Sequence, residues 1–124
     1  MYGSHAVTAR IVVLAPPTVG RRVDVILRSV GYEVHRTPDD GNLGHLVARL
    51  RPRLVIVTLD IRWVNAVEAV HPLLAGTRPV PVLLLGEEQG DPRLDGVPRL
   101  PLAVDAALLL TTVRGLLATS DLGD

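Results

Sequence analysis

The chain has 124 residues, of which 48% are hydrophobic and 21% are charged. This length and this balance fit one globular domain with a core of its own. Thirteen basic residues, all of them arginine, balance thirteen acidic ones, so the net charge excludes a general attraction to nucleic acid or to anionic membrane.

Several chemistries are excluded by what the chain lacks. Without cysteine there is no disulfide, thiolate nucleophile or thiolate metal site. No apolar stretch approaches membrane-spanning length, and residues 1–9 lack the core of a signal peptide. We expect residues 1–9 to be a disordered N-terminus or a tag remnant, residues 10–118 to be one domain, and the protein to be cytoplasmic.

The first elements alternate between strand and helix. A short apolar run predicts a strand at Arg10–Leu14, and Thr18 is expected to cap the helix that follows. Gly31 is expected to end the helix in the left-handed backbone conformation that glycine favours. The more polar Tyr32–Arg36 predicts a strand at a sheet edge. One apolar stripe is predicted along the helix: Val19, Val23, Ile26, Leu27 and Val30.

The central strand lies in the middle of the sequence. A turn at Thr37–Asn42 leads into a helix that is expected to end at Leu50, before Pro52. The β-branched run Leu54–Leu59 predicts a strand buried on both faces. The third helix, Trp63–Leu74, is expected to end or kink at His71-Pro72.

The last third continues the same alternation with one interruption. A fourth strand is predicted at Val80–Leu85, a short fifth strand at Val97–Leu100, and a final helix at Ala103–Ala118 before a polar tail, residues 119–124. Glu87–Gly96 has no sustained helical period and is too short for an ordinary parallel crossover. We expect the helix there to be absent or reduced to one turn.

Repeated strand–helix units predict an α/β fold, a flavodoxin-like, doubly wound, five-stranded parallel sheet. In such sheets the functional groups collect at the carboxyl ends of the strands. That edge is predicted to hold Ala15, Pro16, Thr58, Asp60, Gly86 and Leu100. This set is poor in catalytic groups.

Six stretches carry a resemblance to a known family. They are Ile11-Val12-Val13-Leu14, Pro17-Thr18-Val19 before the first helix, Gly31-Tyr32-Glu33-Val34, Arg51-Pro52-Arg53-Leu54-Val55-Ile56-Val57, Pro81-Val82-Leu83-Leu84-Leu85 and Leu100-Pro101-Leu102. From Arg10 to Leu117 the chain resembles a response-regulator receiver (CheY-like) domain, the phospho-acceptor module of two-component signalling. These stretches belong to the framework and do not report on activity.

The resemblance also implies where the family's active residues would stand. The acid pair that holds magnesium after the first strand is replaced by Ala15 and Pro16, and the phospho-acceptor aspartate by Thr58. The Ser or Thr that ends the fourth strand is replaced by Gly86, and the lysine of the fifth-strand loop by Leu100. The family's phosphorylation site is therefore expected to be lost.

Each replacement has a chemical consequence. Magnesium needs carboxylate oxygens, which Ala15 and Pro16 do not supply. The hydroxyl of Thr58 is a poor nucleophile without a base or metal to activate it. Arg99 is next to the lysine position, but adjacent strand side chains point to opposite faces. We expect no enzyme activity, no cofactor and no metal.

Two further residues near this edge have competing interpretations. Asp60 is either a displaced phospho-acceptor or a solvated loop carboxylate, and the lack of metal-binding partners favours the latter. Trp63 either packs down on its loop or contacts a partner. The four histidines are scattered without metal-ligand spacing, which favours surface or core roles.

The leading hypothesis is a pseudo-receiver, a phosphorylation-independent regulatory module that acts by protein–protein interaction. The alternative is a small-ligand sensor whose altered pocket, with Ala15, Gly86 and Leu100, suits an apolar or neutral ligand. Receivers often precede an output domain, so the chain could be part of a larger regulator. No direct nucleic-acid or membrane binding is expected.

The last helix is apolar on more than one side, which predicts an interface. We expect Ala106, Leu110, Val113 and Leu117 to face the core and Leu109 and Leu116 to stay partly exposed. Without a full crossover helix, fourth-strand side chains would also lack cover on one face. Surplus apolar surface favours a homodimer. The alternative is that Glu87–Gly96 folds back over the sheet and the extra leucines widen the core.

Overall fold

The computed structural model describes residues 9–38, 40–59, 66–75, 80–86, 94 and 96–122. Strands and helices alternate as predicted. The strands are β1 (Arg10–Leu14), β2 (Glu33–Thr37), β3 (Leu54–Thr58), β4 (Val82–Leu85) and β5 (Arg99–Leu100). The helices are α1 (Pro17–Arg28), a 3-10 turn (Asp40–Asn42), α2 (Leu43–Leu50), α3 (Ala66–Ala75) and α4 (Ala106–Leu122).

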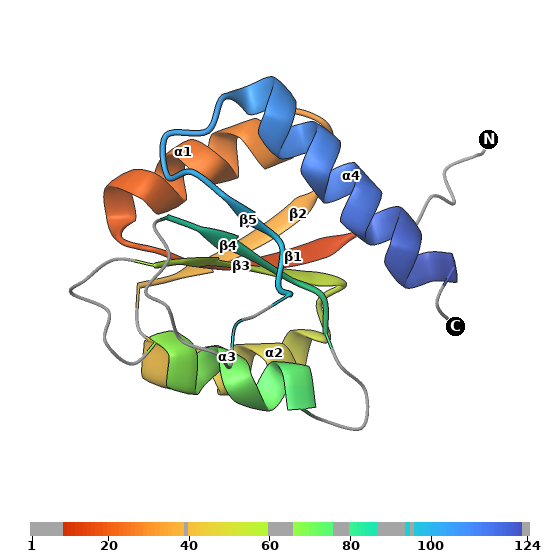
Figure 1. Ribbon diagram of the computed structural model, residues 1–124. Coiled ribbons are helices and arrows are strands. Elements are labelled where there is room, and N and C mark those ends of the chain that lie inside the picture. The colour runs from red at the N-terminus through yellow and green to blue at the C-terminus, as the bar shows by residue number, and fades with distance from the viewer. Residues whose placement is uncertain are drawn as a thin grey trace.

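The five strands form one parallel sheet in the order β2-β1-β3-β4-β5. Helices α1 and α4 cover one face and α2 and α3 cover the other, which gives three layers (Figure 1). This is the flavodoxin-like, CheY-like fold. The more polar β2 lies at an edge of the sheet, as its sequence predicted.

Alternate residues of the strands build two cores, one on each face of the sheet. Ile11, Val13, Leu54, Ile56 and Leu83 pack beneath α1 and α4. Val12, Leu14, Val55, Val57 and Leu84 pack against α2 and α3. Every residue of β3 is buried, because helices cover both faces of the central strand.

Helix α1 begins earlier than predicted. Its N-cap is Pro16, which makes no side-chain hydrogen bond, and Pro17 occupies the first turn. The prediction that Thr18 caps the helix is therefore wrong: proline fixes its own φ near the helical value, so it starts the helix without a capping hydroxyl. Gly31 has the predicted positive φ, 96°.

The predicted apolar stripe of α1 is confirmed in its centre and wrong at its end. Val23 and Leu27 are fully buried, and Val19 and Ile26 pack partly against the same core. Val30 is 42% exposed. Val30 lies beyond Arg28, the last residue of α1. The predicted stripe required the helix to continue to Val30, which it does not.

Helix α2 ends where predicted, and α3 does not. Arg51, with φ of 49°, ends α2 immediately before Pro52. Helix α3 runs through Pro72 to Ala75, so of the two predicted outcomes at His71-Pro72, an end or a kink, the end is wrong. Val70 is fully buried on one side of this proline and Leu73 packs against the same core on the other, which offsets the lost backbone hydrogen bond.

The fourth strand does not lack cover. Val82 and Leu84, whose side chains face α2 and α3, are 3% and 0% exposed, so that prediction is wrong. Leu94 is 1% exposed and belongs to the same core cluster. This burial agrees with the alternative in which part of Glu87–Gly96 lies over the sheet. The predicted loss of a crossover helix falls on residues 87–93 and 95, outside the described residues.

The prediction of which α4 residues face the sheet is confirmed at Val113 and Leu117 and wrong at Ala106 and Leu109. Leu109 is fully buried with Val113 and Leu117, whereas Ala106 is exposed. The Asp105 carboxylate accepts a hydrogen bond from the Leu108 amide at 2.8 Å, so the helix starts at Ala106 and not at Ala103. Because α4 is apolar on several sides, its pattern did not determine which side faces inward.

Regular structure and backbone contacts include residues just outside the span 10–118. Ala9, placed in the disordered N-terminus, is 6% exposed and its carbonyl accepts a hydrogen bond from the Glu33 amide. At the other end α4 continues past Ala118, through Leu122, into the predicted polar tail.

Candidate functional site: the carboxyl edge of the sheet

The carboxyl ends of the strands bring four of the predicted site residues into neighbouring positions. Thr58 pairs with Leu85, which pairs with Leu100. The Gly86 amide donates to the Leu100 carbonyl at 2.9 Å, and the Ala15 amide donates to the Thr37 carbonyl at 3.1 Å. Asp60 and Trp63, also predicted at or above this edge, lie outside the described residues.

Thr58, at the predicted phospho-acceptor position, is enclosed. It is 1% exposed, and its hydroxyl has no hydrogen-bond partner among the described residues. A serine or threonine nucleophile needs a base within hydrogen-bond reach, and Thr58 has none there. The side chain is also shielded from a phosphodonor in solution.

Gly86 adopts a backbone that excludes other residues. Its φ is 127°, outside the range that residues with a side chain commonly adopt. A Cβ built on Gly86 would overlap the backbone carbonyl oxygen of Leu59. The Ser or Thr that the resemblance expects here could not be accommodated without moving Leu59.

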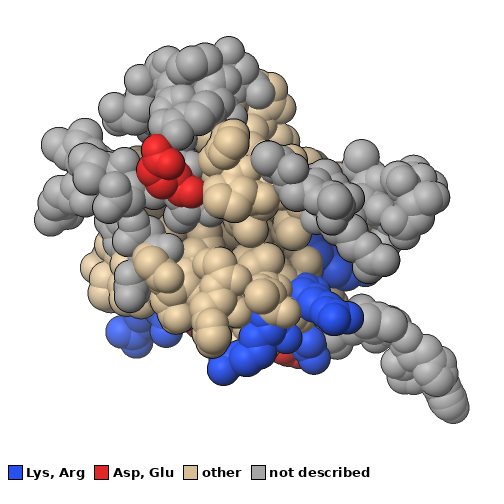
Figure 2. All heavy atoms as spheres, turned by 90° about the horizontal axis from the view of Figure 1, so that it is seen from below, with Lys and Arg blue, Asp and Glu red and all other residues tan. Residues whose placement is uncertain are grey.

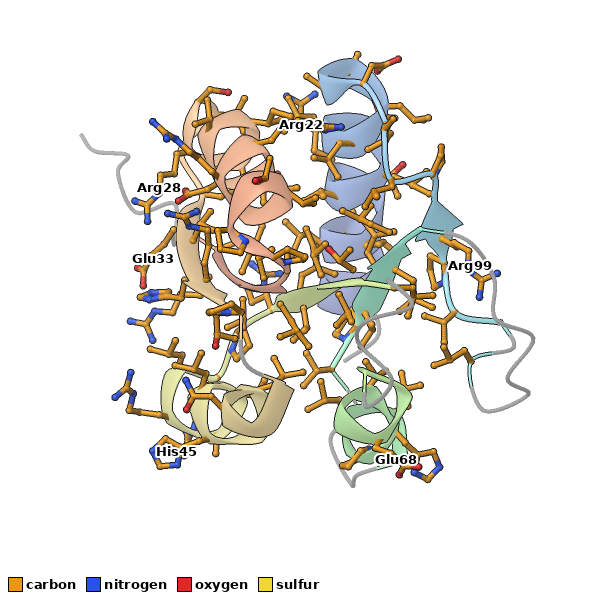
Figure 3. The ribbon with its side chains drawn as sticks, turned by 90° about the vertical axis from the view of Figure 1, so that its left-hand side faces the viewer. Arg22, Arg28, Glu33, His45, Glu68 and Arg99 are labelled. Carbon is orange, nitrogen blue, oxygen red and sulfur yellow. The ribbon has the colours of Figure 1, made fainter. Side chains whose placement is uncertain are left out.

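Leu100 and Arg99 divide between the two faces of β5 as strand geometry requires. Leu100 packs partly against the core beneath α1 and α4. The side chain of Arg99 lies at the outer edge of the sheet (Figure 3), and β4 separates its strand from β3, which carries Thr58. Arg99 therefore does not replace the missing lysine.

Within the described residues, no group of three or more His, Asp or Glu side chains could hold a metal ion. Ala15 is buried and Pro16 is half-buried at the start of α1, so neither offers a ligand at the position of the family's acid pair. The arrangement offers neither a metal site nor a nucleophile with a base.

A polar cluster beside this edge was missed by sequence reasoning. Both oxygens of the Asp24 carboxylate are engaged: one by the Nε of Arg28, the other by the Nε of Arg36 at 3.0 Å. Asp24 and Arg28 are four residues apart on α1, a recognisable helical pair, but Arg36 joins them only because β2 lies beside α1.

A cavity of about 330 Å³ opens at this cluster. It is lined by Ala15, Pro17, Gly20, Asp24, Arg28, Val34, Arg36, Thr37 and Pro38. Ala15 is the one predicted site residue in this lining. Gly86 and Leu100 do not line it, so the apolar ligand pocket predicted around those three residues does not correspond to this polar cavity.

A second hollow, of about 550 Å³, lies on the outer side of α1. Arg22 stands at its rim and points towards α4 (Figure 3). Its Nη1 donates to the Val104 carbonyl at 3.1 Å, which ties α1 to the start of α4.

On the side of the molecule that α2 and α3 cover, the charged side chains lie around the border of the described surface (Figure 2). Seen from the side of α2 and α3, uncharged atoms occupy most of the described surface, and arginines form separate groups around it (Figure 2).

Comparison with solved structures gives receiver domains. A response regulator receiver protein from Burkholderia phymatum is 22% identical, with a TM-score of 0.72 over 90% of this chain and 96% of its own. The signal receiver domain of a modulated diguanylate cyclase from Desulfovibrio desulfuricans is 20% identical, with a TM-score of 0.78 over 95% of this chain and all of its own, 100%. The chain has the receiver-domain fold.

A pseudo-receiver domain is also among the similar solved structures. The pseudo-receiver domain of the CikA protein is 23% identical, with a TM-score of 0.66 over 89% of this chain and 97% of its own. No protein-family model and no curated protein sequence matches the chain. Among the described helices of the receiver fold, none is both long and apolar enough to cross a membrane.

Proposed function

We propose that the chain is a receiver-like signalling module that works without phosphorylation and acts by binding another protein. The receiver fold is present while the positions that receivers use for phosphoryl transfer hold Ala15, Pro16, Thr58, Gly86 and Leu100. The observation that carries the proposal is the enclosed Thr58, which is 1% exposed and whose hydroxyl has no hydrogen-bond partner in the described part of the chain.

Incubation with acetyl phosphate and magnesium, followed by intact-mass measurement, tests the loss of phosphorylation. We expect the mass to stay unchanged, whereas a receiver domain that has the acid pair, aspartate and lysine gains a phosphoryl group under the same conditions. A stable adduct that disappears in Thr58→Ala or Asp60→Asn would overturn the proposal.

The α1/α4 layer supplies the proposed binding surface. Four large hydrophobic side chains of the described residues are exposed: Val25, Val30, Leu102 and Leu108. Val25 lies on α1, Val30 follows it, Leu102 precedes α4 and Leu108 lies on α4. The interface predicted at Leu109 is therefore replaced by one centred on Val25 and Leu108, since Leu109 is buried; Leu116 is half-buried.

The simplest partner is a second copy of the chain, because two-fold homodimers are the commonest assemblies of this kind. Sedimentation at micromolar concentration should then show a dimer that the double substitution Val25→Glu and Leu108→Glu dissociates. His45→Glu, an exposed position on α2 in the opposite layer, is the control and should leave the dimer intact. A wild-type chain that remains monomeric would exclude the homodimer.

A further inference from the structure

One wall of the cavity between α1 and β2 is polar and consists of Asp24, Arg28 and Arg36. Asp24, whose side chain is only 14% exposed, holds two guanidinium groups that come from different elements, Arg28 from α1 and Arg36 from β2. The Nη2 of Arg28 also donates to the Val34 carbonyl at 2.7 Å. Arg28 lies along the β2 edge, on the same side of the molecule as Glu33 (Figure 3).

The charge of this wall is positive. Asp24 neutralises one of the two guanidinium groups and is the one acid among the described lining residues, so these residues together carry a net charge of +1. A guanidinium has five N–H donors. The described contacts use two nitrogens of Arg28 and one of Arg36, which leaves donors of both arginines for a ligand.

Apart from Thr37, the other side chains of the lining are apolar. Ala15, Pro17, Val34 and Pro38 surround the cluster. At Gly20 a Cβ would stand 3.4 Å from the Cδ of Arg36, so the missing side chain leaves space beside that arginine. A cavity of about 330 Å³ is at the lower end of the range for ligand sites, which selects a small molecule.

We infer that this cavity binds a small organic anion, with its carboxylate or phosphate group on Arg36 and Arg28 and its apolar body against Ala15, Pro17 and Pro38. A planar guanidinium group can donate two parallel hydrogen bonds to a carboxylate or a phosphate. Asp24 holds the two guanidinium groups in a fixed orientation before a ligand binds. The cavity shares Ala15 with the positions that receivers use for phosphoryl transfer, but Thr58, Gly86 and Leu100 do not line it. It does not depend on the proposed protein-binding function.

Three probes of similar size separate the role of the charge from that of the apolar body. Phenyl phosphate and benzoate have the same ring with different oxyanions, and benzyl alcohol is the neutral counterpart. In calorimetry or by amide shifts of Ala15, Gly20 and Thr37, we expect at least one anion to bind with one-to-one stoichiometry and benzyl alcohol to bind at least 10-fold more weakly. Inorganic phosphate alone should bind more weakly than phenyl phosphate.

Substitutions of Arg36 and Arg21 test whether the anion binds in this cavity. Arg36→Gln should weaken the anion at least 10-fold, and Arg36→Lys should weaken it less, because lysine keeps the charge but loses the planar guanidinium group. Arg21→Gln, an exposed arginine of α1 outside this cavity, is the matched control and should change the affinity less than 2-fold.

Gly20→Ala separates binding from folding. The added methyl group meets its neighbours at ordinary contact distances and removes a helical glycine, so the thermal midpoint should be kept or raised. It narrows the space beside Arg36, so anion affinity should fall several-fold. Absence of binding by both anions at millimolar concentration, or binding that Arg36→Gln leaves unchanged, would overturn the inference.

Discussion

The carbonyl oxygen of Leu59 occupies the space in which a side chain at Gly86 would begin. Gly86 combines this close approach with a φ of 127°, so a substitution meets both an overlap and an unfavourable backbone. The fourth strand therefore ends in a backbone conformation that only glycine accepts without adjustment.

Gly86→Ala should lower the free energy of unfolding by about 2 kcal/mol or more, since a strained backbone alone costs about 1–3 kcal/mol. Gly115→Ala is the matched control: no atom outside its own stretch of helix lies within 4 Å of its Cβ position, and it is in the interior of α4. This control should raise the free energy by about 0.5–1 kcal/mol. Urea unfolding monitored by circular dichroism measures both. Equal effects would contradict the role given to Leu59.

The hydroxyl of Thr58 should destabilise the fold. A buried hydroxyl without a partner carries a desolvation cost of about 1–3 kcal/mol, and valine has the same shape without it. Thr58→Val should therefore keep or raise the free energy of unfolding, by up to about 1 kcal/mol. Thr58→Asp should lower it, because it buries a carboxylate. Loss of stability in Thr58→Val would mean that the hydroxyl has a partner.

Adjacent leucines of α4 should differ sharply in their effect on stability. Leu109 is fully buried and Leu108 is 45% exposed. Leu109→Ala should cost about 2–5 kcal/mol, whereas Leu108→Ala should change stability by no more than about 0.5 kcal/mol. Because the two substitutions remove the same atoms from neighbouring positions, chemical denaturation reads out the register of the helix directly. The reverse order would place Leu108 in the core.

Glu33 should titrate at unusually low pH. Its carboxylate contacts the Nε2 of His35 at 2.6 Å and the Nε of Arg10 at 3.0 Å, and the hydrogen bond with His35, followed by the charge of Arg10, holds the pKa below the ordinary value of 4.5. A lowered pKa in the folded state means that the stabilisation is complete above about pH 4.5 and is lost as the pH falls through the lowered value.

Carbon-detected NMR titration of Glu33 measures this pKa. In His35→Gln the pKa should move up towards 4.5, and in His45→Gln, an exposed histidine on α2 that makes no described contact with Glu33, it should not move. An unchanged pKa in His35→Gln would assign the shift to Arg10 alone.

The sequence alone determined the layers of this protein. β-branched runs such as Leu54–Thr58 cannot be exposed on either face, so they required a parallel sheet covered on both sides. Because each strand and its helix are close in the chain, the alternation also placed Ala15, Thr58, Gly86 and Leu100 at one edge. From the same positions the sequence predicts that the active residues of receiver domains are replaced in this chain.

Only the tertiary structure decided the rotational register of α4, the steric limit at Gly86 and the contacts between residues distant in the chain. Leu108 and Leu109 are identical in sequence terms, and only the start of α4 at Ala106 turns one inward and the other outward. The need for glycine at Gly86 arises from the carbonyl of Leu59, which belongs to a different strand connection. The cluster of Asp24, Arg28 and Arg36 forms because β2 packs beside α1, a contact that no local pattern records.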